Sequence, residues 1–266
     1  MAEFKGRVLV IAGSDSGGGA GIQADIKTIT ALGGFAATAI TAITVQNTLG
    51  VSGVYPIPVD IVEAQARAVL EDIGADVIKT GMLGTSELVN VVSELLAEYR
   101  DIPLVLDPVM VATSGDALVD EKAVDAIRNQ LLPRAALITP NAPEAEKLTG
   151  RSVSTTQDQM EAGKAIVEMG AEAALVKGGH LSGTTITDVL VTATMTMIFE
   201  SERQETRNTH GTGCTLASAI ATGLSKGRSL PDAIEAGGNY LSEAIRRAPG
   251  FGSGHGPVHH AWVVDR

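Results

Sequence analysis

The sequence has a single cysteine, few aromatic residues and fewer basic than acidic residues. Each of these shortages argues against a class of protein. One cysteine among 266 residues excludes a disulfide within the chain, and no Cys/His cluster has the spacing of a zinc site. Aromatic residues make up only 3% of the chain, too few for the stacking platforms that bind single-stranded nucleic acid. The net charge of -11 at pH 7 argues equally against a nucleic-acid partner.

Long apolar runs are also missing. No run reaches the roughly 20 residues of a membrane-spanning helix, and the first residues, MAEFKGRVLVIAG, lack the apolar segment of a signal peptide. We therefore expect a cytoplasmic enzyme without a membrane partner. Hydrophobic residues make up 44% of the chain, which indicates a globular protein with a sizeable core. Since no linker, repeat or low-complexity segment divides the sequence, we expect one domain over residues 1–266.

Apolar runs of strand length alternate with amphipathic helical patterns along the chain. The expected strands are 7–12, 36–45, 51–55, 76–80, 104–107, 136–139 and 173–177, with a hairpin over 188–200. The expected helices are 22–32, 59–73, 87–99, 122–132, 143–148, 157–169 and 230–247, with one more after residue 214. This alternation predicts an α/β fold with a mostly parallel sheet covered on both faces. The stretch 36–55 is expected to form a short edge flap.

A glycine-rich stretch, GSDSGGGAG at residues 13–21, lies between the first expected strand and the first expected helix. Open α/β sheets bind ligands at the carboxyl ends of their strands. Five glycines in nine residues are more than a tight turn needs, although a simple turn remains the structural alternative. We interpret the stretch as a flexible loop that lets a ligand approach the backbone closely.

A second glycine loop, His210-Gly211-Thr212-Gly213-Cys214, opens directly into an apolar helical pattern. The unpaired N–H groups and the positive dipole end of such a helix form an anion site, with phosphate as the expected ligand. At this position the pKa of a thiol tends to fall. The loop matches neither the Walker motif nor the dinucleotide fingerprint. The structural alternative is a glycine-rich helix cap with a buried structural cysteine. His210 is interpreted separately, as a residue that shapes the loop.

Polar side chains follow three further strands of the expected sheet. They are Asp107, Asn141 with Glu144, and Lys177. A parallel sheet would bring them to one edge together with the loop at residue 13, where carboxylate and amide oxygens suit Mg²⁺ and a lysine suits phosphate. The structural alternatives are a turn cap for the aspartate, helix caps for the asparagine and the glutamate, and a solvated surface charge for the lysine. Convergence with two glycine loops favours Mg²⁺-assisted phosphoryl transfer.

Eight motifs together resemble those of a known family. They are AGSDSGGGAGIQADIKT, TAITVQNT, KTGML, DPVMVATSG, ITPNAPEAEKL, VKGGH, NTHGTGCTLASAIA and the tail GHGPVHH. In this order, over nearly the whole chain, they resemble the hydroxymethylpyrimidine/phosphomethylpyrimidine kinases of thiamin (vitamin B1) biosynthesis. That family has the ribokinase-like fold, a three-layer αβα sandwich. Sugar kinases of the same fold usually carry an aspartate base where this chain has Cys214.

The resemblance implies ATP- and Mg²⁺-dependent phosphorylation of hydroxymethylpyrimidine to its monophosphate, and of the monophosphate to the diphosphate in the same site. The pyrimidine pocket it implies is lined by Gly13, Ala20, Thr44, Gln46, Met82 and Val109. The other implied site residues are Gly211, Gly213 and Cys214 for catalysis, Asn141, Lys177 and Thr212 for ATP, and Asp107 and Glu144 for the metal. The usual state of the family is a homodimer.

One position departs from the family pattern. Bacterial relatives usually have a lysine in the last long helix where this chain has Gly237-Gly238-Asn239-Tyr240, so the phosphate or nucleotide contact of that lysine is not carried over. The histidine-rich tail is interpreted as structural and not as a metal site.

Two other functions remain as alternatives. A pyridoxal kinase of the same branch would also take a substrate with a hydroxymethyl group beside a polar ring edge, and the sequence separates the two substrates poorly. A non-catalytic ligand sensor would be expected to lose the magnesium and phosphate residues, and all of these are present.

Overall fold

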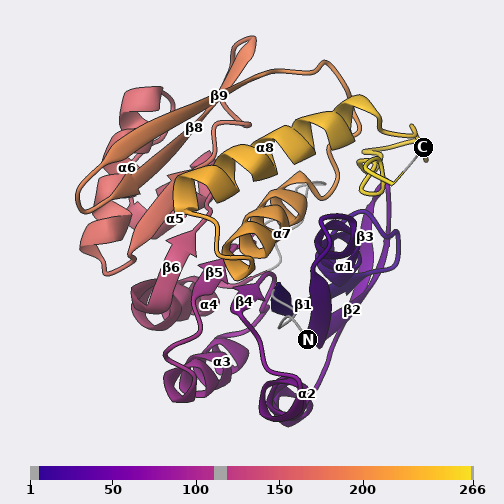
Figure 1. Cartoon of the computed structure of the whole chain (residues 1–266), viewed down its shortest axis with the longest axis vertical. Helices are drawn as coiled ribbons and strands as arrows, with labels where there is room; N and C mark the ends of the chain where they lie inside the picture. The colour runs from indigo at the N-terminus through magenta and orange to yellow at the C-terminus, as the bar shows by residue number, and fades with distance from the viewer. Residues whose placement is uncertain (1–5, 111–118, 265–266) are drawn as a thin grey trace.

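The computed structural model describes residues 6–110 and 119–264, and a nine-stranded sheet runs through them in the order β3-β2-β1-β4-β5-β6-β7-β8-β9 (Figure 1). The strands are β1 (Arg7–Asp15), β2 (Phe35–Asn47), β3 (Gly50–Pro56), β4 (Val77–Thr80), β5 (Leu104–Leu106), β6 (Ala135–Ile138), β7 (Ala173–Val176), β8 (Thr185–Thr192) and β9 (Thr196–Glu202). The six central strands, β2, β1, β4, β5, β6 and β7, pair in parallel. At the two edges, β3, β8 and β9 pair antiparallel. The expected mostly parallel sheet, its edge flap and its hairpin are therefore confirmed.

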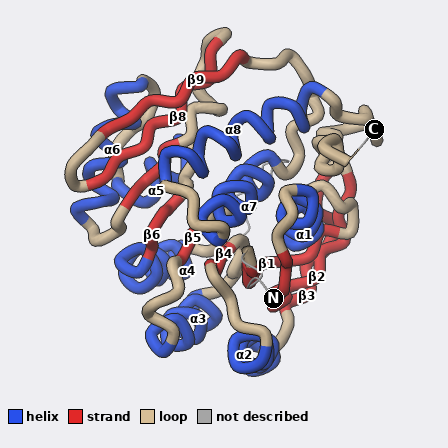
Figure 2. The backbone as a smooth tube through the Cα atoms, viewed as in Figure 1, coloured by secondary structure: helices blue, strands red, loops and turns tan. Residues whose placement is uncertain are grey.

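Helices cover both faces of the sheet (Figure 2). They are α1 (Gly21–Ala31), α2 (Val59–Asp72), α3 (Ser86–Glu98), α4 (Glu121–Ala126), α5 (Ala142–Thr149), α6 (Thr156–Glu168), α7 (Thr212–Ser225) and α8 (Leu230–Arg246). Side chains of β1 alternate between two cores: Val8 and Val10 pack with α1, α7 and α8, and Leu9 packs with α2 to α6. None of the helices in the described ranges combines the length and apolar character that crossing a bilayer requires.

The helix expected over 122–132 is divided. α4 ends at Ala126, and the chain continues through a π-helical turn (Ile127–Leu131) and a 3₁₀ turn (Leu132–Arg134). Pro133 lies in the last turn, where it has no N–H to donate and its ring disfavours a continued α-helix. The proline therefore ends the helix and turns the chain into β6.

The C-terminal tail is fastened to α7 and α8. The backbone N–H of His259 donates to the carbonyl of Ala244 over 2.9 Å, and the hydroxyl of Tyr240 donates to the carbonyl of His260. The ring Nε2 of His260 lies 3.0 Å from the hydroxyl of Thr215, and burial lowers the pKa of this histidine to about 4. The contacts support the structural interpretation of the tail.

Two adjacent glycines in α8 are expected to respond oppositely to alanine. A methyl group on Gly238 would meet no atom within 4 Å, so Gly238→Ala should gain helix propensity and raise the free energy of unfolding by roughly 0.5–1 kcal/mol. A methyl group on Gly237 would lie 3.1 Å from Cγ1 of Ile220 in α7, and this crowding should cancel the gain. Urea unfolding of the two variants measures the difference. Equal shifts of the midpoint would show that Gly237 is not needed for close packing of the two helices.

Candidate functional site

One cavity of about 720 Å³ lies at the carboxyl ends of the parallel strands. Every residue expected for the pyrimidine pocket, the catalytic loop, ATP and the metal lines this cavity. The end of the DPVMVATSG motif, from residue 111 on, lies outside the described residues. The strand-end convergence expected from the sequence is therefore present in the fold.

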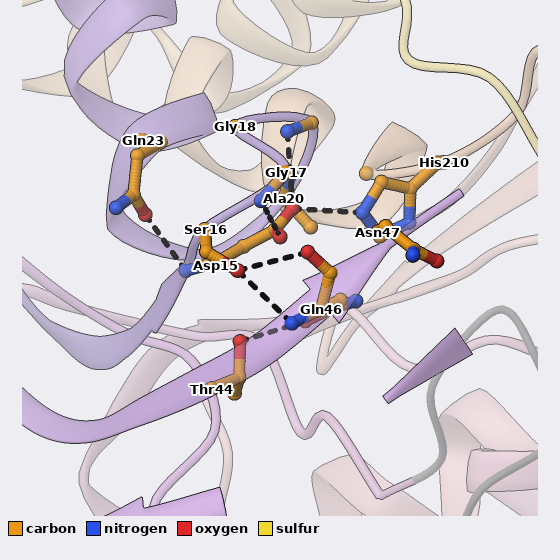
Figure 3. Close-up of polar contacts among 12 residues, drawn as sticks. Asp15, Ser16, Gly17, Gly18, Ala20, Gln23, Thr44, Gln46, Asn47 and His210 are labelled. Atoms are coloured by element: carbon orange, nitrogen blue, oxygen red, sulfur yellow. Dashed lines mark hydrogen bonds and ion pairs between the residues drawn. The ribbon is translucent and has the colours of Figure 1, made fainter. Parts of the chain in front are cut away.

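Asp15 organises the first glycine loop (Figure 3). β1 runs three residues past its expected end, and the buried Asp15 carboxylate accepts N–H bonds from Gly17 at 2.7 Å, Gly19 at 3.0 Å and Ala20 at 2.8 Å. Its Oδ2 also lies 2.8 Å from Nε2 of His210. Burial alone would raise the pKa of Asp15, but these bonds lower it overall. The loop is held by one buried carboxylate, in contrast to the flexible loop expected from its glycine content.

The second glycine loop is pressed against the first. Gly211, the N-cap of α7, has φ +80°, and a Cβ at this position would lie 1.8 Å from the carbonyl oxygen of Gly19. Only glycine fits this position without moving one of the two loops. Since the residues of the first turn, Thr212 to Cys214, line the cavity, the N-terminal end of α7 opens into it.

Asp107 and Lys177 form a buried pair in the wall of the cavity. Nζ of Lys177 lies 3.3 Å from Oδ1 of Asp107, and the hydroxyl of Thr139 donates to the same oxygen over 3.1 Å. Burial would lower the pKa of Lys177, but the charges of Asp107 and Glu144 raise it, so the ammonium stays charged. The side chain of Lys177 is only 13% exposed, which makes the surface-charge alternative wrong.

The second carboxylate oxygen of Asp107 is available to a ligand. Oδ2 is buried and makes no hydrogen bond within residues 6–110 and 119–264. A buried carboxylate oxygen of this kind normally has a partner. Since the aspartate also lines the cavity, this oxygen suits a cation or a donor bound there.

Asn141 and Glu144 cap α5 and also line the cavity. The Asn141 side chain accepts from the Glu144 N–H over 2.9 Å, and Glu144 Oε2 accepts from the Asn141 N–H over 2.8 Å. The helix-cap alternative is therefore correct without excluding a role at the site. Burial raises the pKa of Glu144 to about 7, a direction that Asp107 adds to and Lys177 opposes. A bound cation would favour the ionised form.

The carboxylates of Asp107 and Glu144 fit Mg²⁺. The described part of the chain has no group of three or more histidine, cysteine or acidic side chains that could enclose a metal. Mg²⁺ does not need one, because it binds through one or two carboxylates and completes its shell with water and substrate phosphates. The partnerless oxygen of Asp107 and the carboxylate of Glu144 line the same cavity and provide such a donor set.

Cys214 lies in the first turn of α7, as expected, but its pKa does not fall. Burial raises the pKa of the thiol to about 12, although the charge of Lys79 and the N–H of Gly21 act in the opposite direction. The expectation of a lowered pKa is therefore wrong: desolvation exceeds the effect of the helix N-terminus. Without a ligand, the thiol is protonated at neutral pH.

The expected pyrimidine pocket is built on the ends of β1 and β2. The hydroxyl of Thr44 lies 2.8 Å from the carbonyl oxygen of Ser14 and 3.1 Å from Oε1 of Gln46, which holds the Gln46 amide beside the first glycine loop (Figure 3). On the other side, a Cβ at Gly13 would lie 2.6 Å from Cε of Met82. The missing side chain therefore lets methionine pack directly against the loop backbone.

Sequence reasoning missed two features near the site. One is Asp15 as the centre of the loop contacts, and the other is a fully buried ion pair between Asp25 and Lys79. The signal for the pair was present, because Lys79 interrupts an apolar strand pattern and Asp25 stands in the first amphipathic helix. Opposite charges on two buried elements indicate a pair.

A parallel α/β sheet whose strand ends bring carboxylates, a buried lysine and two glycine loops to one cavity defines a small-molecule kinase of the ribokinase-like fold. The chain belongs to the phosphomethylpyrimidine kinase family, whose profile matches residues 15–259.

Three relatives show the extent of the likeness. The hydroxymethylpyrimidine/phosphomethylpyrimidine kinase of Streptomyces coelicolor is 48% identical over 257 residues, which cover 97% of this chain and 95% of the relative. The thiamine biosynthesis bifunctional protein ThiED of Geobacter sulfurreducens is 48% identical over 261 residues, 98% of this chain but only 53% of that protein's length. Pyridoxal kinase of Bacillus subtilis, in a crystal structure with ADP, has a TM-score of 0.92 at 35% identity and covers 99% of this chain and 100% of its own.

Proposed function

We propose that this chain transfers a phosphoryl group from ATP to hydroxymethylpyrimidine and then, in the same site, to the monophosphate, as a cytoplasmic step of thiamin biosynthesis. Family membership and the names of its relatives support the substrate. The observation that carries the chemistry is the meeting of three groups. A Cβ at Gly213 would lie 3.4 Å from Nζ of Lys177 and 4.0 Å from Oδ2 of Asp107. Anion loop, cation and partnerless carboxylate thus face one point of the cavity.

The proposed binding mode follows from this arrangement. The pyrimidine ring lies against the first glycine loop, with Gln46 at its polar edge and Met82 beside it. The transferred phosphoryl group lies at the N-terminal turn of α7, within reach of Lys177. Asp107 and Glu144 would hold Mg²⁺, which would neutralise charge on the phosphates. Since such transition states are loose, positioning and charge stabilisation carry most of the catalysis.

The nucleotide is proposed to occupy the other end of the cavity. There the lining comes from α8 and the β8–β9 hairpin, with apolar side chains of Ile186, Leu241 and Ile245. Gly238 belongs to the same wall and leaves open space where the family usually has a lysine. The remaining phosphate contacts therefore fall to Lys177 and the backbone of the anion loop.

A pyridoxal kinase is the second candidate. The TM-score of 0.92 to Bacillus subtilis pyridoxal kinase favours it, because the two backbones are closely similar over 99% of this chain. The higher sequence identity to the Streptomyces kinase favours the pyrimidine substrate. A coupled ADP-release assay with both substrates distinguishes them.

Gln46 is expected to recognise the aminopyrimidine edge. A glutamine amide has a donor and an acceptor side by side, and a ring nitrogen with its neighbouring amino group is the complement. Gln46→Glu loses the donor, and an unpaired buried polar group costs about 1–3 kcal/mol, so kcat/KM for the aminopyrimidine should fall roughly 5- to 150-fold. The KM for ATP should stay nearly constant. If steady-state kinetics show unchanged kcat/KM for the aminopyrimidine and unchanged KM for ATP, Gln46 only caps the strand end and does not recognise the ring.

A homodimer is proposed on the edge hairpin. Ile43 and Val45 of β2 and Tyr55 of β3 are apolar and at least 49% exposed, and Tyr55 pairs with Ile43, so they share one face. We expect size-exclusion chromatography with light scattering to give twice the chain mass of 27.4 kDa. Val45→Glu should shift the mass toward the monomer, while the control Ile198→Glu on the exposed edge of β9 should not. A monomeric wild-type protein would contradict the proposal.

A further inference from the structure

A buried charged network lies outside the residues already assigned. Nζ of Lys79 on β4 lies 3.0 Å from Oδ1 of Asp25 on α1, and both side chains are 0% exposed. The hydroxyl of Ser218 on α7 donates to the same carboxylate oxygen over 2.6 Å. Apolar residues of similar volume often replace a buried ion pair without loss of stability. Stability alone is therefore weak grounds for such a pair.

The network lies one helical turn beneath the thiol of Cys214. Ser218 follows Cys214 by four residues on α7, so the two side chains share a face of that helix. Asp25 follows Gly21 by four residues on α1, and the N–H of Gly21 acts on the thiol to lower its pKa. Helices α7 and α1 thus each contribute to the network a residue one helical turn further along, namely Ser218 and Asp25.

The ammonium group of Lys79 also lies directly behind the cavity wall. Gly81 lines the cavity, and a Cβ on it would lie 3.2 Å from Nζ of Lys79 and 3.0 Å from Cβ of Ala12. Because Gly81 has no side chain, only its backbone stands between the Lys79 ammonium and a ligand in the cavity. In a site from which water is excluded, a charge so placed acts strongly.

The groups around Lys79 keep it charged. Burial would lower its pKa, but the charges of Asp25 and Asp107 raise it instead. Asp25 keeps a second oxygen, Oδ2, that is buried and without a hydrogen bond among the described residues. The carboxylate is therefore held by Lys79 and Ser218 through its other oxygen alone.

We propose that Lys79, held by Asp25 and Ser218, is a positioning residue for Cys214 whose fixed positive charge stabilises negative charge on the sulfur and on the substrate oxygen beside it. The proposal rests on the proposed function, in which Cys214 adjoins the hydroxyl group that accepts phosphate. Lys79 itself does not touch the substrate. It acts through the thiol and through the wall formed by Gly81.

The single cysteine of the chain allows a direct test. Iodoacetamide reacts only as its CH₂ carbon bonds to the deprotonated sulfur and iodide leaves, so the alkylation rate reports the thiolate at Cys214 without any substrate. The main variant is Lys79→Met combined with Asp25→Leu, because removing both charges leaves no unpaired ion in the core. Ser218→Ala is the variant of smallest structural change, and Lys164→Met, an exposed position on α6, is the control.

We expect the double variant to keep its Tm within a few degrees. Its alkylation should be several-fold slower than that of wild type, because at the thiol the charge of Lys79 outweighs the opposing charge of Asp25. Its kcat should fall about 10- to 100-fold, while the KM for the aminopyrimidine stays nearly constant. Ser218→Ala should show smaller losses in the same two readouts, and Lys164→Met none. If the double variant folds and shows the alkylation rate and kcat of wild type, the network has only a structural role. If the double variant does not fold, wild-type values in Ser218→Ala would lead to the same conclusion. If wild-type protein fails to phosphorylate the aminopyrimidine, the proposed function fails, but the alkylation rates still decide the role of Lys79.

Discussion

Replacement of Asp107 by alanine is expected to lower kcat about 10²- to 10³-fold or more in a protein that still folds. The substitution removes the buried, partnerless oxygen that suits Mg²⁺, and it also removes the carboxylate that lies 3.3 Å from Lys177. Charge that develops on the transferred phosphoryl group would then lack its cation. Lys177 keeps a partner in the nearby charge of Glu144, so we expect the fold to survive.

Two controls separate this role from a structural one. Asp107→Asn keeps the shape and the hydrogen bond from Thr139 but loses the charge, so its kcat should fall nearly as far as in Asp107→Ala. Circular dichroism and thermal unfolding should show folded protein for both. Excess chelator should abolish turnover of the wild-type protein, and added Mg²⁺ should restore it. Full turnover in chelator would refute the metal assignment of Asp107 and Glu144.

Cys214→Ala is expected to fold and to lose most of its kcat, about 10²-fold or more. The thiol lies in the first turn of α7, at the mouth of the anion site, where it can hold the substrate hydroxyl in line with the phosphoryl group. Burial raises the pKa of this thiol to about 12, so in the empty site it acts as a donor and positions the hydroxyl more than it takes a proton. A loose transition state needs little base catalysis.

Cys214→Asp distinguishes position from chemistry. An aspartate can accept the hydroxyl proton and still reach the same point, so this variant should retain more activity than Cys214→Ala. Thermal unfolding controls for loss of packing around this side chain, which is mostly but not fully buried. Wild-type kcat in Cys214→Ala would assign the residue to packing alone.

The sequence was sufficient for the architecture and for the convergence of strand ends. Apolar runs such as 104–107 and 173–177 match β5 and β7 closely, because buried parallel strands have a nearly uniform composition. Parallel order then required Asp107 and Lys177 to meet at one edge. Their 3.3 Å contact follows from this topology more than from any local motif.

Electrostatic details could not be predicted in the same way. The helix position of Cys214 was correct, but the direction of its pKa depends on burial by α1 and β4, which no spacing along the chain reveals. Likewise, Asp15 is only a loop residue in the sequence, and its three amide bonds and its contact with His210, 195 residues away, arise from the fold. Desolvation and long-range pairing are properties of the packed molecule.

A coupled assay of ADP release tests the central claim most directly. Purified protein with ATP and Mg²⁺ would be offered hydroxymethylpyrimidine, its monophosphate, pyridoxal and a sugar in parallel. We predict turnover with both pyrimidines, with kcat/KM for hydroxymethylpyrimidine above that for pyridoxal, and no turnover with the sugar. Turnover of pyridoxal without turnover of either pyrimidine, or of none of the four, would contradict the proposed function.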